Sequence, residues 1–286
     1  MDRVDVDLPR GIRLDGAWHR RAVLRPVTGR DEAFLLEHTR ALWPAQRTTA
    51  LLTRCLCRLG PLSAVTAEVV RALSIGDREA LLLHLRRFTL GETMDCVFAC
   101  PACAEKLELE LQVADFLLPP YADPAEVHET SLRVGDGSWR VRFRLPNGGD
   151  QELAAPHAAA PEAAVEQVLR GCLQEICDER TGEAIADITA PVAAALGQTM
   201  AELDPQAEIL LDLVCPACDT AFRTPLDIGD YFYRELQGRA DDLYQDVHLL
   251  AFHYHWSERE ILALSRRKRR LYLDLLAASV REGFVQ

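Results

Sequence analysis

The residues of this sequence best suited to chemistry are two identical tetrapeptides, Cys-Pro-Ala-Cys, at residues 100–103 and 215–218. A Cys-x2-Cys turn directs two thiolates at one point, and two such turns complete a tetrahedral Zn2+ site. Four thiolates leave no position open for water or substrate, so the expected ion is structural. The spacing does not distinguish Zn2+ from Fe2+. The predicted ligands are Cys100, Cys103, Cys215 and Cys218.

The similarity of the two segments continues beyond the cysteines. Residues 104–116 and 219–231 place apolar residues at matched offsets, and each segment ends in Asp followed by an aromatic residue. Apolar residues alternate before the second turn and after the first, which is typical of strands. We therefore expect each tetrapeptide at the tip of a β-hairpin, with two hairpins holding one ion as a zinc ribbon split by an insertion. The alternative, two unrelated redox or buried cysteine pairs, leaves the matched downstream residues unexplained.

Composition indicates a globular protein of a reducing interior. The chain has 286 residues, of which 49% are hydrophobic and 27% charged, and no apolar run is long enough to span a membrane. Its start lacks the apolar core of a signal peptide, so we do not expect secretion by that route. Nine cysteines, four of them in zinc spacing, argue against a disulfide framework. Cys55 and Cys57 are expected as core residues on a helix, whereas Cys96 is an alternative metal ligand.

The charge of the chain argues against nucleic-acid binding. The formal net charge is −12, and a field of that sign repels phosphates. The one dense basic run, Arg266 to Arg270, could belong to a helix-turn-helix that contacts a phosphate backbone. A solvated helix face, or a patch that docks an acidic partner, is the interpretation we prefer. His248, His253 and His255 are not spaced to share one helix face, so we expect core and surface positions for them.

The first third of the chain predicts short strands followed by short helices. Residues 3–27 alternate as strands around an Asp15-Gly16 turn. Thr28 and Asp31 form a helix start of the capping-box type. The expected helices cover residues 31–40, 45–59, 64–73 and 77–88. In the last of these, Asp77 is the expected N-cap and the arginines are expected outside. The segment 76–79 could be a charged contact site, but a capped helix start with solvated charges is the simpler interpretation.

The rest of the chain predicts one further hairpin and several helices. The expected elements are a hairpin at residues 132–145, a low-complexity linker at 154–161, helices near 162–177 and 191–202, and one long helix through residues 236–251. Ser257 opens a capping box for a short helix, and Ser265 is expected to cap the last helix. The leucines expected on or near the core side of that helix are Leu271, Leu273, Leu275 and Leu276.

These elements define an α+β fold: a mostly helical chain with a split four-cysteine zinc ribbon and a small inserted region of hairpin and helices. The expected domains are residues 1–95 (short strands plus helices), 96–118 with 208–229 (the split ribbon), 119–207 (the insertion) and 230–286 (C-terminal helices). The sequence contains no Gly-rich phosphate loop, nucleophile elbow or His-Glu zinc-protease motif. We therefore do not expect an enzyme.

Several segments resemble the baseplate proteins of contractile phage tails and of phage-derived contractile injection systems. They are Leu73–Gly91, which runs into the first cysteine turn, Phe143–Pro146, Asp204–Glu208 and Asp246–Leu264. The resemblance extends from about Ala72 to Leu276 and is nearest to T4-type baseplate hub and hub-assembly proteins. It implies a non-enzymatic baseplate component or assembly factor, cytoplasmic in the producing cell and able to enter the assembled particle. The zinc-spaced cysteines would correspond to that family's metal turns, whereas the large insertion with its alanine-rich linker departs from the pattern.

The expected function is therefore that of an interaction protein in a contractile-tail baseplate, held in shape by a structural zinc. Other baseplate or tail proteins are the expected partners, and neither a small-molecule substrate nor nucleic acid is expected. Two alternatives are a nucleic-acid-binding or regulatory zinc-ribbon protein that uses the basic run, and a metal-dependent enzyme with an open ligand position. Candidate interface anchors, with ordinary core as the alternative, are Tyr231, Phe232, Tyr233 and Trp256.

Overall fold

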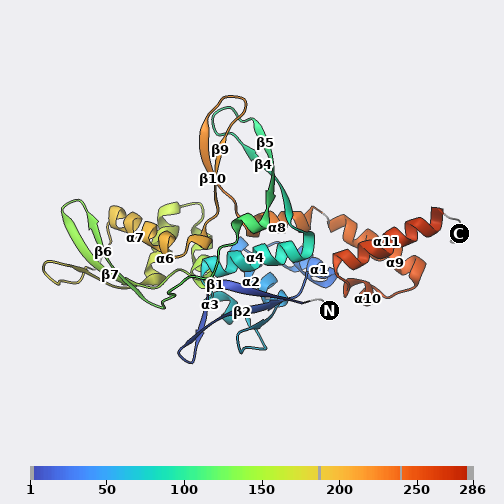
Figure 1. Cartoon of the computed structure of the whole chain (residues 1–286), viewed down its shortest axis with the longest axis horizontal. Helices are drawn as coiled ribbons and strands as arrows, with labels where there is room; N and C mark the ends of the chain where they lie inside the picture. The colour runs from blue at the N-terminus through green and yellow to red at the C-terminus, as the bar shows by residue number, and fades with distance from the viewer. Residues whose placement is uncertain (1–2, 186–187, 239, 282–286) are drawn as a thin grey trace.

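The computed structural model describes residues 3–185, 188–238 and 240–281, and it shows an α+β fold. A central body surrounds α4 (Ile75–Leu90), with a three-stranded sheet on one side and two protruding β-hairpins on the other (Figure 1). A second three-stranded sheet with its helices lies at one end of the long axis, and three C-terminal helices lie at the other (Figure 1).

The first sheet is formed by strands that flank two helices in the sequence. Its elements are β1 (Val4–Leu14), β2 (Ala17–Leu24), α1 (Gly29–His38), α2 (Pro44–Cys55) and β3 (Leu56–Leu59). β1 and β2 pair antiparallel across a turn at Asp15 and Gly16, which both have positive φ (49° and 82°). β3 then pairs with the other edge of β2. The predicted hairpin within residues 3–27 is confirmed. We call these elements the first sheet module.

The second sheet repeats this order, and we call its elements the second sheet module. They are β6 (His128–Val134), β7 (Gly137–Phe143), α5 (Gly148–Ala154), α6 (Pro161–Cys172) and β8 (Leu173–Asp178). β6 and β7 form the hairpin predicted at 132–145, and β8 pairs with β7. In both modules the last helix passes into the third strand without a loop, at Cys55 and at Cys172. The helices predicted at 45–59 and 162–177 are therefore too long, because pairing with a distant strand ends them.

The predicted linker at residues 154–161 is a short connection between two helices, with a 3-10 turn of its own. α5 begins after Asn147, whose side chain accepts the Asp150 backbone N–H in a capping box. A 3-10 turn over Ala155–His157 then leads into α6. Residues 158–160 form a turn between the two, so the segment is a short, ordered connection between α5 and α6. The segment Asn147–Asp150 thus starts a helix and does not merely close the hairpin.

The turn between hairpin and helix is built in the same way in both sheet modules. An arginine and an aspartate six residues apart form a bidentate ion pair in each: Arg25–Asp31 (2.6 and 3.0 Å) and Arg144–Asp150 (2.6 and 2.9 Å). Each aspartate also accepts the backbone N–H of the N-cap residue, Thr28 or Asn147 (2.9 Å in both). The capping box predicted at Thr28 is confirmed, and its counterpart lies 119 positions later.

Two groups of three helices also resemble each other. The first unit is α2, α3 (Ala67–Ala72) and α4, and the second unit is α9 (Ala240–Tyr254), α10 (Glu258–Leu262) and α11 (Arg266–Arg281). In each unit a short helix follows Thr66 or Ser257, and the sequence Ala-Leu-Ser leads from it into a long helix. The fourth residue of the long helix is in both cases a fully buried arginine, Arg78 or Arg269. From the short helix onward, matched residues lie 191 positions apart.

Each sheet module docks on the unit that comes from the other half of the chain. The backbone N–H of Gly29 donates to the Leu264 carbonyl (3.1 Å), and that of Gly148 donates to the Leu73 carbonyl (3.2 Å). A side chain at Gly148 would place its Cβ 2.3 Å from the guanidinium of Arg78, so the close approach requires glycine. We call these contacts the C-terminal joint (first sheet module with second unit) and the central joint (second sheet module with first unit).

The buried apolar residues form one large and one smaller core. The large core joins the first sheet, α2, α4, α8 (Ile228–Gln237) and the bases of the two protruding hairpins. The smaller core joins the second sheet to α6 and α7 (Ala190–Leu203), and α7 confirms the helix predicted at 191–202. Between the first unit and the second, the predicted single helix through 236–251 is instead two helices, because α8 ends at Gly238.

The charged residues at the start of α4 are buried, contrary to the prediction. α4 begins at Ile75 with Ser74 as its N-cap, so Asp77 is not the cap. Asp77 instead accepts the backbone N–H groups of Arg10 (2.9 Å) and Gly11 (2.8 Å) and thereby ties α4 to β1. Arg78 and Arg86, expected to face solvent, are 0% and 3% exposed. Long-range partners therefore decide the burial here, and a single-helix pattern does not show them.

The last two helices match the prediction in part. The capping box at Ser257 is confirmed, and α11 begins directly after Ser265. Leu276 is buried (7% exposed), as expected, but Leu271 and Leu275 are 56% and 52% exposed. α11 thus has an apolar surface that the part of the chain described by the structure leaves uncovered.

Candidate metal centre

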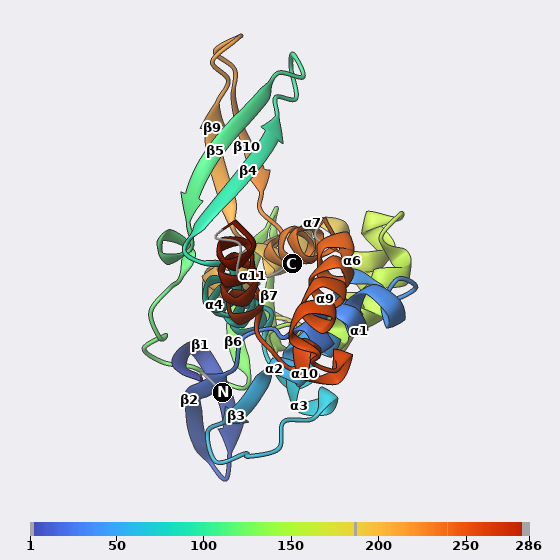
Figure 2. The same ribbon diagram turned by 90° about the vertical axis from the view of Figure 1, so that its right-hand side faces the viewer.

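The two cysteine tetrapeptides lie at the tips of the two protruding hairpins. The hairpins are formed by β4 (Thr93–Ala99) with β5 (Lys106–Gln112) and by β9 (Leu210–Val214) with β10 (Ala221–Pro225). Each is a separate two-stranded antiparallel sheet. They rise side by side from the body in both views (Figures 1 and 2). The hairpin positions predicted for both tetrapeptides are confirmed.

The two turns have the same backbone geometry. The N–H of Ala104 donates to the Cys100 carbonyl and that of Asp219 donates to the Cys215 carbonyl, both at 2.9 Å. Ala104 and Asp219 adopt positive φ (60° and 54°), which is uncommon for residues other than glycine. The two tetrapeptides thus end in the same turn conformation, as their identical sequences suggest.

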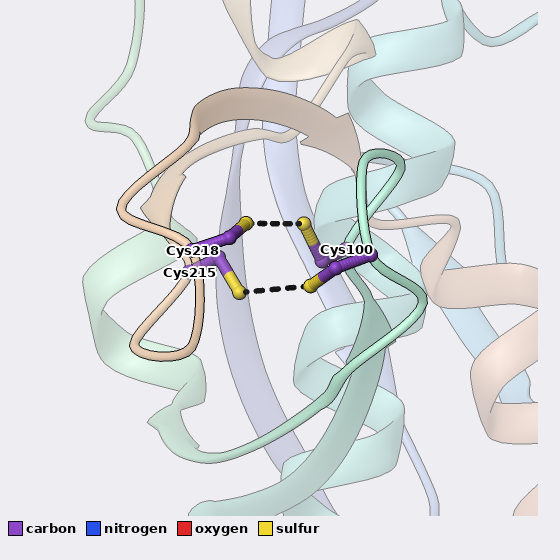
Figure 3. Close-up of side chains that lie close together, drawn as sticks. Cys100, Cys215 and Cys218 are labelled. Carbon is purple, nitrogen blue, oxygen red and sulfur yellow. Dashed lines mark hydrogen bonds between the residues drawn. The ribbon is translucent and has the colours of Figure 1, made fainter.

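The four sulfur atoms form one compact cluster. The Sγ atoms of Cys100 and Cys218 are 3.7 Å apart and those of Cys103 and Cys215 are 3.6 Å apart, so each close pair joins one hairpin to the other (Figure 3). All four lie within 4.8 Å of one another. A tetrahedral Zn2+ with Zn–S bonds of about 2.3 Å has sulfur–sulfur edges of about 3.8 Å. The donor set and its dimensions therefore fit a four-thiolate metal ion.

The surroundings favour ionisation of some sulfurs over others. Hydrogen bonds with the Thr220 side chain and backbone lower the pKa of the Cys218 thiol to about 6. For Cys103, a backbone hydrogen bond at Glu105 acts in the same direction, but the neighbouring thiols, Cys218 first, raise its pKa to about 12. Closely spaced thiols resist carrying negative charge together, and a divalent cation among them removes that repulsion. Cys100 and Cys215 are buried beneath the tip, whereas the other two are exposed.

Cys96, the alternative ligand, and the other cysteines and histidines considered in the sequence lie outside this cluster. Cys96 lies on β4 and is buried (4% exposed), but it is not one of the clustered cysteines. Cys55 is a core residue, as predicted, whereas Cys57 lies on a strand and is half-buried. His248 and His253 belong to no group of three or more potential ligands among the residues that the structure describes.

The basic run at 266–270 is largely occupied by contacts within the chain. Arg269 is fully buried and donates to both carboxylate oxygens of Glu32 (2.8 and 2.9 Å). The prediction of a solvated basic face is therefore wrong at Arg269, whose acidic partner belongs to the same chain. Arg266 and Arg270 pair with Asp242 (3.6 Å) and Asp274 (3.2 Å) on the second unit itself.

The predicted aromatic anchors divide into core and partly exposed residues. Phe232 and Tyr233 are 0% and 7% exposed in the large core, so the core alternative holds for them. Tyr231 is partly buried, and its hydroxyl donates to the Asp95 carbonyl at the base of the first hairpin (3.1 Å). Trp256 stacks on Tyr254 within the second unit.

Residues of the two joints went unnoticed in the sequence, although a signal was present. Ala-Leu-Ser occurs at 72–74 and at 263–265, in each case with an arginine four positions after the serine. A search for internal repeats would find this match. It does not show that each arginine is buried, because the partner segments lie far away in the sequence.

No helix within the described residues combines the length and the apolar character that crossing a bilayer requires.

A protein-family model matches this chain. It is described as T4 bacteriophage base plate protein, and the match covers residues 18–233. The matched region contains both cysteine hairpins, the whole second sheet module and the first sheet module from β2 onward, and it ends within α8. Neither a curated protein nor a solved structure matches the chain significantly.

Proposed function

Because the chain belongs to the T4 bacteriophage base plate protein family, we propose that it is a non-enzymatic interaction or assembly component of a contractile-tail baseplate, stabilised by a structural zinc ion. The resemblance seen in the sequence is confirmed by the family match over most of the chain. The observation that carries the zinc proposal is the cluster of four sulfurs, contributed by two hairpins more than a hundred residues apart.

A metal at the tip would supply the cross-link that the hairpins otherwise lack. Their bases are anchored in the large core through residues such as Met94 and Leu226, and Tyr231 contacts the first hairpin near its base. At the tip, a small group of buried residues (Cys100, Leu107 and Cys215) is the apolar contact. A core of that size contributes little, whereas structural metal binding contributes many kcal/mol to the folded state. Zn2+ would therefore make the two hairpins one rigid projection.

The rigid projection is suited to contact neighbouring subunits. Val97 and Val214, on β4 and β9 near the tip, are 60% and 62% exposed. Apolar side chains on a preorganised surface bind with less entropic cost than the same residues on separate hairpins. We propose that the ribbon, expected at residues 96–118 and 208–229, presents this surface to other baseplate proteins. The nucleic-acid alternative loses support, because the net charge is −12 and Arg269, in the middle of the basic run that it requires, is buried against Glu32.

Metal analysis of purified protein tests the zinc proposal. We expect one Zn2+ per chain and loss of that metal in the double variant Cys215→Ser/Cys218→Ser. Cys177→Ser is the matched control, because Cys177 is a half-buried cysteine outside the cluster and its replacement should leave the metal content unchanged. Hydrogen exchange should become faster at the hairpin tips of the double variant, while the body, which has its own core, keeps its protection. Equal metal content in wild type and double variant would overturn the proposal, and iron in place of zinc would correct its ion.

Complementation of tail assembly tests the baseplate role. Deletion of the gene for this chain should leave the producing cells without complete contractile tails, and the wild-type gene should restore them. The double cysteine variant should restore fewer tails than Cys177→Ser. Normal tails in the deletion strain would show that the chain is not a required baseplate component, whatever its metal content.

A further inference from the structure

The first unit holds a helix in the groove between its two long helices. α8 lies against α2 and α4 (Figure 1). At its start, a Cβ placed on Gly229 would lie 3.2 Å from the Thr48 hydroxyl on α2 and 3.5 Å from Leu82 on α4. At its end, Glu235 accepts two hydrogen bonds from Arg86 of α4 (3.0 and 2.8 Å). α8 therefore runs parallel to α4.

The face that α8 turns to this groove is strongly apolar. Ile228, Phe232 and Leu236 recur every fourth residue, and all are at most 3% exposed. Tyr233 adds a ring that lies beneath the Arg47 guanidinium, 4.4 Å from the ring centre. The first unit thus binds an amphipathic helix through one apolar stripe and one ion pair.

The matching groove of the second unit is not filled by any of the described residues. α9 and α11 lie side by side at the end of the molecule that faces the viewer in Figure 2. A groove of about 790 Å³ lies along them. In α4, Leu82 and Arg86 contact α8, and Glu79 lies near the acidic residues at the start of α8. The residues 191 positions later are Arg270, Leu273 and Ala277, and all three line the open groove.

This groove is lined by apolar side chains set among charged residues of both signs, namely Asp242, Asp246, Asp274, Arg266, Arg270 and Arg281. Leu249 on α9 and Val280 on α11 line it, and they are 41% and 49% exposed. Exposed apolar residues gathered in a groove between packed helices are typical of helix-in-groove recognition.

Charge distinguishes the two grooves and indicates what the second one would accept. In the first unit, Glu79 lies near the acidic start of α8, where burial and then Asp227 raise its pKa to about 8. In the second unit, the residue at the Glu79 position is Arg270, which is 75% exposed and forms a solvent-exposed pair with Asp274 one turn later (3.2 Å). An acidic first turn, which is unfavourably placed beside Glu79, would be stabilised beside Arg270.

From these observations we infer that the groove between α9 and α11 binds an amphipathic helix of another baseplate protein. That helix lies parallel to α11, with its acidic first turn at Arg270 and its large apolar side chains against Leu249, Leu273 and Val280. The inference rests on the proposed function for the identity of the partner and goes beyond it by naming the surface and the chemistry recognised. It is independent of the zinc ion.

Site-specific photo-crosslinking in cells that assemble the particle tests this inference. A photoreactive phenylalanine analogue at Leu273 should crosslink to an apolar helical segment of another baseplate protein, identified by mass spectrometry. The same analogue at Leu271 is the matched control, because Leu271 lies on α11, is 56% exposed and does not line the groove. A crosslink to a second copy of this chain or to nucleic acid, or equal yields at both positions, would overturn the inference.

Charge reversal gives a second measurement that does not depend on the packing of the second unit. The probe is a synthetic peptide of the crosslinked segment. Arg270→Glu should weaken its binding about fivefold at low salt, with a smaller effect at high salt. Arg267→Glu, an exposed position of the same basic run outside the groove, should leave binding unchanged. Unchanged binding in Arg270→Glu would contradict the proposed orientation.

The two proposals fail in different experiments. If deletion strains assemble tails normally, the proposed function fails. If only these groove measurements fail, the function stands and the groove assignment does not.

Discussion

The two joints use one backbone arrangement with different side-chain chemistry. In the C-terminal joint, Arg269 lies against Gly29 and neutralises its charge directly with Glu32 (2.8 Å) and with Asp246 (3.4 Å). In the central joint, Arg78 lies against Gly148 and donates to uncharged acceptors, namely the Thr49 hydroxyl (3.1 Å) and the carbonyls of Val70 (3.2 Å) and Ala45 (3.0 Å). Its Nε has no partner among the described residues.

The difference teaches which features of a joint are fixed by geometry and which can vary. The glycine and the backbone hydrogen bond are the same in both joints because two segments must approach closely. The compensation of the buried charge differs, because α2 supplies a threonine beside Arg78 where α9 supplies an aspartate beside Arg269. The buried apolar contact of the C-terminal joint is a small cluster of Ala33, Leu36 and Leu243, whereas the first unit packs in the large core. The second unit therefore depends more on its ion pair than the first unit does.

The largest expected effect is therefore at Glu32. Glu32→Ala leaves the fully buried Arg269 with the longer contact to Asp246 as its charged partner, beside the Leu264 carbonyl (3.1 Å), and loss of one partner of a buried pair costs about 3–5 kcal/mol. Urea unfolding measures the change in free energy, and hydrogen exchange should show the loss of protection mainly in α9–α11. The double variant Glu32→Leu/Arg269→Met, which removes both charges, should be less destabilised than Glu32→Ala. A cost below about 1 kcal/mol for Glu32→Ala would show that Asp246 alone satisfies Arg269.

A pH-dependent effect distinguishes the first unit from the second. Burial, with a contribution from Asp204, raises the pKa of Asp77 to about 6, whereas the matched residue of the second unit is the exposed Lys268. The folded state thus binds a proton at Asp77 in a pH range where the unfolded chain, with a pKa near 3.8, does not. This contribution to stability is complete below about pH 4 and is lost as the pH rises through 6, with a total of about 3 kcal/mol.

The measurement is the difference in unfolding free energy between wild type and Asp77→Asn at several pH values. That difference should change by up to about 3 kcal/mol between pH 4 and pH 7, in favour of wild type at the lower pH. Lys268→Gln is the control at the matched position and should give a difference that does not vary over this range. A constant difference for Asp77→Asn would mean that Asp77 titrates alike in the folded and unfolded chain.

Local signals predicted much of the fold and of the site. The Cys-Pro-Ala-Cys turns, the alternating residues beside them and the capping boxes at Thr28 and Ser257 are formed by neighbours in the sequence, and the structure has them where expected. The failures are of one kind. β3 and β8 continue directly from helices, and Arg78 and Arg269 are buried, because segments far away in the sequence supply their partners. Local periodicity contains no information about those partners.

The smallest expected effect is at Thr49, and it tests whether the central joint relies on uncharged acceptors. The Thr49 hydroxyl accepts a hydrogen bond from Arg78 and donates one to Glu152, so it links the buried arginine to a carboxylate that does not contact it directly. Thr49→Val keeps the shape and removes both bonds, and we expect a loss of about 1–2 kcal/mol in unfolding free energy. Thr53→Val, one turn later on α2, removes a hydroxyl that donates only within its own helix and should cost less than about 0.5 kcal/mol. If Thr49→Val cost as much as Glu32→Ala, both arginines would depend on a carboxylate to the same extent, and the chemical difference between the joints would be one of distance alone.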